Sequence, residues 1–226
     1  MTKAKKRSAS SPRRNPLFRL LKYEAEDERF LQISGDFAGL IRRSEKARRN
    51  AARQGNPDYA EAVAEREADY LEELVGASFL VLQTKIRRVT RAAERLAKFM
   101  REHHGLTMNG LDHQSIFGLG GNCRKTGHSR IALIWAVGNY YKHRDEWDAE
   151  VWKDPPTGAQ GRDPHRQSRG TRRTVEKLGI VQHSPNNMRR ALEFFGIKPY
   201  SKCEVLAEKV QAWAKKVYQL AEKECR

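Results

Sequence analysis

Residues 129–150, SRIALIWAVGNYYKHRDEWDAE, decide the fold. Ser129 can begin a helix, because its hydroxyl can accept a hydrogen bond from a free backbone N–H of the first turn. Between 131 and 141 the apolar residues surround the helix instead of forming one stripe: Ile131, Leu133, Ile134, Trp135, Val137, Tyr140 and Tyr141. A helix that is apolar on all sides is buried on most of them. We therefore expect this segment to be the central helix of the domain.

The second half of this helix carries a polar face. Asn139, Lys142, His143 and Glu146 follow at i, i+3, i+4 and i+7, and Trp135 lies one turn earlier on the same face. Polar groups that emerge from a buried helix need partners or water. One interpretation is a structural network in which His143 bonds to Asn139 or Glu146. The other is a site in which His143 titrates. Residue types alone favour the network.

The composition favours a nucleic-acid partner. The 226 residues carry 44 Lys and Arg against 28 Asp and Glu, which gives a formal net charge of +16. Such an excess favours a polyanion, most simply RNA or DNA, although charge can also serve only to keep a protein in solution. A hydrophobic share of 38% is enough for a modest core, and this length suits one compact domain with a tail or two small domains.

The patterns of cysteine, histidine and apolar residues further narrow the class of protein. The three cysteines are odd in number and lack a CxxC spacing, so we expect neither a disulfide framework nor a zinc site. The histidines lack a metal-ligand spacing such as HExxH. No apolar run approaches the ~20 residues of a membrane span. We expect a cytoplasmic protein in a reducing compartment, without a metal, a cofactor or membrane contact.

The N-terminal region is basic. Residues 1–22 hold eight Lys and Arg and no Asp or Glu, which predicts a disordered tail. Residues 23–53 predict a helical region interrupted at 34–36, and its second half is strongly basic. We group residues 1–57 as a basic N-terminal extension, partly disordered, ahead of a helical domain over 58–226. Its candidate nucleic-acid-binding residues are Arg42, Arg43, Arg48 and Arg49.

The remaining segments predict a helical bundle. Spacings of three and four predict one long helix over 58–101, or two helices with a break near Gly76, where a neighbouring helix could cross closely. We favour the continuous helix. Residues 102–128 predict a long Gly-rich loop, whose GLGG run does not match a phosphate-binding loop. Further helices are expected over 187–195 and 203–223. No strand-period alternation is present, so the fold class is all-α.

A second basic loop is expected over 161–173, which follows the polar end of the central helix in sequence. If this loop folds back there, it gathers positive charge around His143. Its candidate nucleic-acid-binding residues are Arg162, Arg166, Arg169, Arg172 and Arg173.

Three stretches resemble the HEPN-like helical proteins of bacteria. The run GNYYKHRDEW at 138–147 is similar to the signature helix of that family. LEELVGASFLVLQTKI at 71–86 resembles the long first helix of such bundles, and ALEFFGI at 191–197, followed by an amphipathic helix, resembles their C-terminal part. The resemblance covers residues 58–224.

This resemblance implies a helical bundle that forms a homodimer, often within toxin–antitoxin or anti-phage systems, where an antitoxin or other regulatory protein is a partner. Many members are metal-independent ribonucleases whose motif is Arg, four to six residues, then His. His143 matches the motif histidine and Asn139 the polar position. The motif arginine is absent, because Ala136, Val137 and Gly138 stand where it would be.

Three functional hypotheses follow. In a ribonuclease, His143 would act as acid or base, Lys142 or Arg144 would stabilise the charge on the phosphate, and Asn139 would orient the ring or the phosphate. The candidate catalytic residues are then Asn139, Lys142, His143, Arg144 and Glu146. The second hypothesis is a non-catalytic nucleic-acid-binding protein. The third is a structural or interaction protein with a buried polar network.

Overall fold

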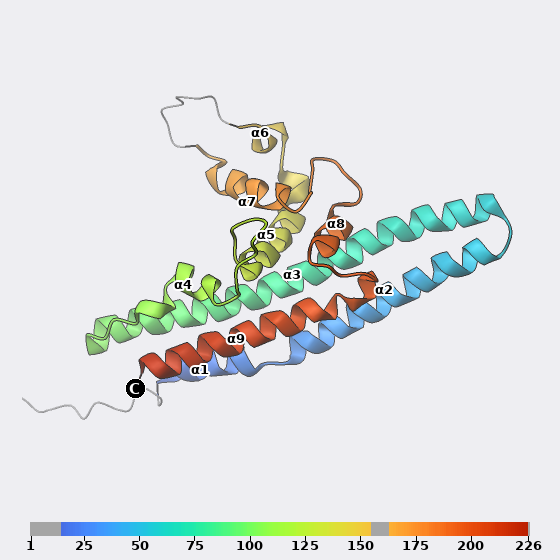
Figure 1. The fold of residues 1–226 in the computed structure, drawn as a ribbon. Coiled ribbons are helices and arrows are strands. Elements are labelled where there is room, and N and C mark those ends of the chain that lie inside the picture. The colour runs from blue at the N-terminus through green and yellow to red at the C-terminus, as the bar shows by residue number, and fades with distance from the viewer. Residues whose placement is uncertain (1–14, 155–162, 226) are drawn as a thin grey trace, which may run out of the picture.

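The computed structural model describes residues 15–154 and 163–225. Within these ranges the chain is helical, with no β-strand and a single isolated bridge between Asn122 and Ser129, so the predicted all-α class is confirmed. The longest helix, α3 (Pro57–His104), runs through the middle of the molecule (Figure 1). None of the described helices combines the length and the apolar character that crossing a lipid bilayer requires.

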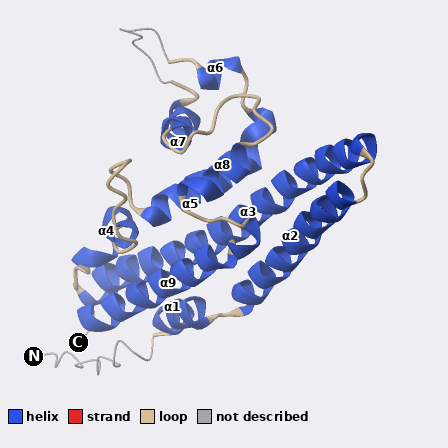
Figure 2. Cartoon of the chain, turned by 45° about the vertical axis from the view of Figure 1, so that its right-hand side comes forward, coloured by secondary structure: helices blue, strands red, loops and turns tan. Residues whose placement is uncertain are grey.

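Helix α3 is continuous, as favoured from the sequence. It begins after Asn56, whose side chain accepts a hydrogen bond from the Tyr59 amide at 3.1 Å, and it ends at Gly105, which has a left-handed φ of 66°. Its 48 residues span about 72 Å. On one side of it lie α1 (Pro16–Glu26), α2 (Arg29–Arg53) and α9 (Glu204–Glu224). On the other lie α5 (Arg130–His143) and α8 (Asn187–Phe194), as Figures 1 and 2 show.

Helix α1 corrects the predicted extent of the disordered tail. Residues 16–22 belong to this helix, which begins after Asn15, whose side chain accepts from the Leu17 amide at 2.8 Å. Phe18 and Leu21 are buried against the other helices, and this apolar contact outweighs the basic composition of the segment. The rest of the predicted tail, residues 1–14, lies outside the described residues.

Helix α2 is unbroken, so the predicted interruption at 34–36 is wrong. Ser34 is buried inside the helix, and its hydroxyl donates to the Phe30 carbonyl at 2.8 Å. This internal bond satisfies the serine, and a single glycine beside it costs only about 1 kcal/mol in a helix. Ala38 and Ile41, on the next two turns of the helix, are also buried.

A single hydrophobic core runs through the described part of the chain. It joins Phe18 and Ile41 of the first two helices to Leu82 of α3 and Trp213 of α9. The boundary drawn at residue 57 is therefore a turn between α2 and α3, which are packed against each other, and it does not separate two cores. Helices α8 and α9 span nearly the residue ranges that the sequence predicts, 187–195 and 203–223.

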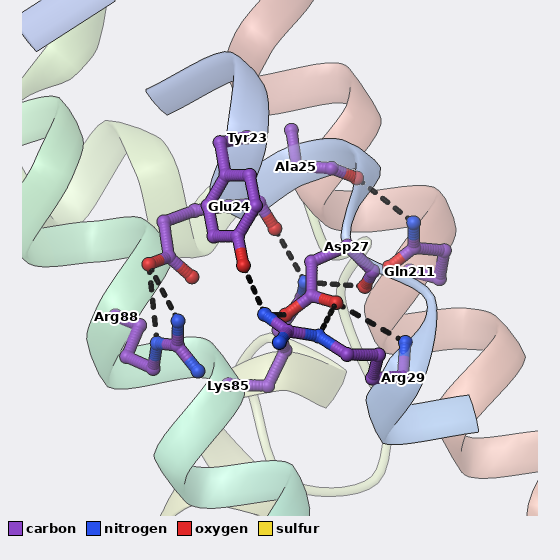
Figure 3. Close-up of polar contacts among 8 residues, drawn as sticks. All are labelled: Tyr23, Glu24, Ala25, Asp27, Arg29, Lys85, Arg88 and Gln211. Atoms are coloured by element: carbon purple, nitrogen blue, oxygen red, sulfur yellow. Dashed lines mark hydrogen bonds and ion pairs between the residues drawn. The ribbon is translucent and has the colours of Figure 1, made fainter. Parts of the chain in front are cut away.

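The junction of α1 and α2 is held by side chains from other helices (Figure 3). Lys85 of α3 is 3% exposed, and its amine donates to the carbonyls of Glu24 and Asp27, the latter at 2.8 Å. Gln211 of α9 donates to the Ala25 carbonyl at 2.8 Å. Carbonyls at the end of a helix have no partner within the helix. These two side chains therefore cap α1 from α3 and α9.

Residues 102–128 contain more structure than the predicted loop. Helix α3 extends to His104, and a 3-10 turn, η2 (Asn109–Leu111), and a short helix, α4 (His113–Gly118), follow. Asp112 caps α4 by accepting from the Ser115 amide at 3.0 Å. Ile116 is buried, and its carbonyl accepts a hydrogen bond from the Trp213 indole at 2.8 Å. Burial against α9 thus orders a segment whose glycines suggest a loop.

Helix α5 begins as predicted, with the Ser129 hydroxyl accepting from the Ala132 amide at 3.1 Å. It crosses α3 at very short range. A Cβ on Gly138 would lie 2.7 Å from the Phe79 carbonyl oxygen and 2.6 Å from Gln83 Cβ. Where a Cβ on Gly76 would stand, the ring of Tyr141 is already present, which confirms the close crossing expected at Gly76.

Replacing Gly138 with alanine should destabilise the protein by about 1–3 kcal/mol, because the added methyl must displace the α3 backbone. Urea unfolding measures this free energy. Gly170 is the control, since a Cβ there meets nothing within 4 Å. Gly170→Ala should be neutral or stabilise by up to about 1 kcal/mol, because alanine favours the helix. Equal effects of the two variants would contradict the close crossing.

Candidate nucleic-acid interface

Two adjoining hollows lie beside α5. The first, of about 460 Å³, is bordered by α3, α4 and the second half of α5. The second, of about 720 Å³, is bordered by α4, the start of α5 and α7 (Arg166–Glu176). Both hollows are lined by His113, Phe117, Trp135 and Gln167. Because they share these walls, we treat them as one feature and call it the α5 groove.

Three cations line the first hollow. Arg87 and Arg91 come from successive turns of α3, and Lys142 comes from α5. All three are exposed, and within the described ranges none of them makes an ion pair or a side-chain hydrogen bond. The carboxylate of Glu94 in this hollow lies 3.4 Å from His113 Nδ1. The hollow therefore presents positive charge that the rest of the described chain does not neutralise.

An aromatic wall separates the two hollows. Trp135 is partly exposed, and no hydrogen-bond acceptor in the described parts of the chain meets its indole N–H. Phe117 faces the same hollows, and the His113 ring stacks on it with centroids 4.4 Å apart. A flat aromatic surface thus borders a groove that also carries free cations.

A row of polar side chains crosses the groove from α3 to α7. The Gln83 amide donates to Asn139 Oδ1 at 3.3 Å, and Asn139 Nδ2 donates to Thr171 Oγ1 at 3.3 Å. Thr171 in turn donates to the Gln167 carbonyl at 3.3 Å. These bonds fix which end of the Asn139 amide faces which helix. Asn139 is therefore a positioned amide within the groove, and its partners are these residues and not His143.

His143 and Glu146 lie outside the groove. Helix α5 ends at His143, and the 3-10 turn η3 (Arg144–Glu146) follows, so Glu146 does not continue the helical face. His143 Nδ1 lies 2.8 Å from Glu146 Oε2, and the His143 side chain is 31% exposed. Of the two network partners that the sequence allowed, the structure selects Glu146.

Arg144 faces a different part of the molecule. Its guanidinium bonds Glu73 Oε1 at 2.5 Å and covers the Tyr141 ring at 4.5 Å. Burial and the Glu73 carboxylate raise the pKa of Tyr141 to about 12. The five candidate catalytic residues therefore do not meet: Asn139 and Lys142 line the groove, His143 and Glu146 form a separate pair, and Arg144 is paired with Glu73.

The predicted Arg-rich loop is largely helix α7, and two of its arginines are structural. Arg169 is 8% exposed and bonds Asp163 at 2.7 Å. Arg172 is 4% exposed and bonds Asp154 at 2.5 Å. Both also donate to carbonyls of the short helix α6 (Ala149–Trp152). Both guanidinium groups are buried and bonded mainly within the protein, so the structure gives them a structural role, and their part in nucleic-acid binding stays a prediction.

None of the other predicted arginines that the structure describes lines the groove, and one of them is next in sequence to a groove residue. Arg166 is exposed beside Gln167, a groove residue, whereas Arg173 pairs with Asp154 at 3.1 Å. Arg162 lies outside the described residues. Four arginines belong to α2 and line neither hollow: Arg42, which lies 3.6 Å from Glu204, and Arg43, Arg48 and Arg49.

A further cation, Lys177, contacts a histidine that lines the second hollow. Lys177 Nζ lies 3.1 Å from His128 Nε2 and donates to the Thr126 carbonyl at 3.3 Å. Burial, and secondarily the Lys177 charge, lowers the pKa of His128. His128 lines the second hollow. In the two described stretches, no group of three or more His, Cys, Asp or Glu side chains gathers as metal ligands do.

The sequence analysis did not include Arg87 and Arg91 in the site. Their spacing of four residues, which places them on one face of α3, is the signal in the sequence that could have identified them.

No protein-family model, curated protein or solved structure matches this chain. The resemblance to HEPN-like proteins accordingly stays a prediction.

Proposed function

We propose that this protein binds nucleic acid, with RNA as its leading partner, along the α5 groove. The observation that carries the proposal is the set of three unpaired cations, Arg87, Arg91 and Lys142, beside the partly exposed Trp135 in one hollow. Phosphate oxygens are natural partners for arginine and lysine, and base rings for tryptophan. The net charge of +16 favours approach of a polyanion from a distance.

Salt dependence of binding tests this proposal. Fluorescence anisotropy with a labelled RNA of mixed sequence gives the association constant at several salt concentrations. Three phosphate contacts predict that log K falls with log salt with a slope of about −2 for a single strand. DNA of the same sequence serves as the second ligand. Absence of binding, or affinity that does not change with salt, would contradict a phosphate-binding groove.

A metal-independent ribonuclease is the second candidate, and the His143–Glu146 pair supports it. A carboxylate at 2.8 Å from Nδ1 orients the imidazole and leaves Nε2 to take or give a proton, which is how a general base is arranged. The HEPN-like resemblance adds three further proposals to this second candidate only: a homodimer, an antitoxin partner, and a toxin or anti-phage role.

If the protein is a ribonuclease, His143→Ala should slow RNA cleavage strongly. It should leave RNA affinity unchanged, because His143 lines neither hollow. The assay follows the length of labelled RNA in the presence of EDTA. Loss of a general base predicts a decrease of about a hundredfold or more in the cleavage rate. Glu146→Gln, which keeps the size but not the charge, should give a smaller decrease. Cleavage by His143→Ala at the wild-type rate would remove this candidate.

A further inference from the structure

We infer that the α5 groove is specific for single-stranded nucleic acid, with one base stacked on Trp135 and its edge contacted by Asn139. The inference rests on the proposed function, because it assigns the form of the ligand for the same groove. Its grounds are the position of the aromatic ring, the free hydrogen-bonding capacity of the amide, and the arrangement of cations on either side.

Trp135 supplies the stacking surface. It borders both hollows, is partly exposed, and forms no ring contact with another aromatic side chain in the described segments. Bases inside a duplex already stack on each other, so a ring in a groove gains contact only with an unstacked base. An open tryptophan between two hollows therefore favours a strand whose bases can turn outward.

Asn139 is placed to contact the edge of that base. It follows Trp135 by one turn of α5, and helical side chains lean toward the N-terminus, so its amide leans toward Trp135. Gln83 and Thr171 each use one hydrogen-bonding position of the amide. One lone pair on Oδ1 and one hydrogen on Nδ2 remain. Adenine offers two edges with an adjacent donor and acceptor, N6 with N1 and N6 with N7, beside the larger ring of a purine.

Charge is distributed to hold a strand on both sides of the stacked base. Arg87, Arg91 and Lys142 border the first hollow. Beyond the second hollow, Lys177 contacts His128, which lines that hollow. A strand that crosses the Trp135 ring therefore meets cations before and after it. This order of a stacking ring between phosphate contacts is typical of proteins that bind single strands.

The test compares single-stranded and duplex RNA on wild type and on Trp135→Leu. Wild type should prefer the single strand, and Trp135→Leu should bind it about tenfold more weakly. The salt slope should stay the same, because no phosphate contact is lost. Trp135→Phe should retain part of the affinity. Trp152→Leu is the matched control, since Trp152 packs on Tyr140 and Trp147 outside the groove.

Asn139→Leu adds a readout that a loss of stability would not produce. Wild type should bind oligoadenylate more tightly than oligouridylate, and Asn139→Leu should reduce this difference severalfold. Salt-dependent binding that is equal for duplex and single strand, and unchanged in Trp135→Leu, would overturn the inference and leave the proposed function intact. Absence of binding to any RNA would instead overturn the proposed function.

Discussion

Replacing Arg87, Arg91 and Lys142 together with glutamine is expected to weaken RNA binding about a hundredfold near physiological salt. Each cation that neutralises a phosphate releases counterions, so three lost contacts should also reduce the steepness of the salt dependence by about 2. Glutamine keeps the aliphatic part of each side chain. The three residues are exposed and unpaired in the described chain, so the fold should not change. Anisotropy with single-stranded RNA measures both quantities.

A second triple variant provides the control for net charge. Lys22, Lys98 and Lys215 are exposed lysines outside the groove, and each faces a glutamate at 3.6–3.9 Å. Changing them to glutamine removes the same number of positive charges. The control should lose only a few-fold in affinity, because distant charges are screened. If both triple variants lose affinity equally, binding depends on net charge and not on the groove.

Lys85→Met should destabilise the fold by about 2–4 kcal/mol, measured by urea unfolding. Methionine fills the space of the aliphatic chain but leaves the Glu24 and Asp27 carbonyls without their donor. It also removes the ammonium that lies 4.8 Å from the centroid of the Phe30 ring. Lys22→Met is the control, since Lys22 is exposed, and it should change stability by less than about 0.5 kcal/mol.

The same lysine gives the stability a defined pH dependence. Burial lowers the pKa of Lys85 below the ordinary lysine value of 10.5. Between the lowered pKa and 10.5 the unfolded chain binds more protons than the native state, so the contribution of Lys85 to stability rises with pH. The stability difference between wild type and Lys85→Met should therefore widen as the pH rises toward 10.5. A difference that narrows over this range would contradict a buried, protonated amine at the end of α1.

Periodic apolar segments could be predicted from the sequence, and segments stabilised by distant partners could not. Helix α3 and the start of α5 follow from apolar spacing and from the Ser129 cap. Helix α7 contains a dense run of arginines, which suggests a solvated loop. In the structure it is a helix in which Arg169 and Arg172 are buried and pair with Asp163 and with the exposed Asp154. Counting charges along the chain cannot show which of them will be paired.

Only part of the candidate site could be predicted from the sequence, because the rest depends on contacts between distant segments. The polar face that contains Asn139 and Lys142 does line a groove. The cations opposite it, Arg87 and Arg91, are brought there by the close crossing at Gly138, which requires the packed structure. Glu146 leaves the polar face because α5 ends at His143, and a helical wheel has no information on where a helix stops. His143 bonds to Glu146 outside the groove.

Mapping where RNA touches the protein tests the α5 groove as the binding site. Single-stranded RNA containing 4-thiouridine is crosslinked to the full chain by ultraviolet light, and the modified peptides are identified by mass spectrometry. Crosslinks are expected on peptides that contain Trp135 and Phe117, aromatic residues that line both hollows. Crosslinks confined to α2, with none on α4 or α5, would contradict this binding site.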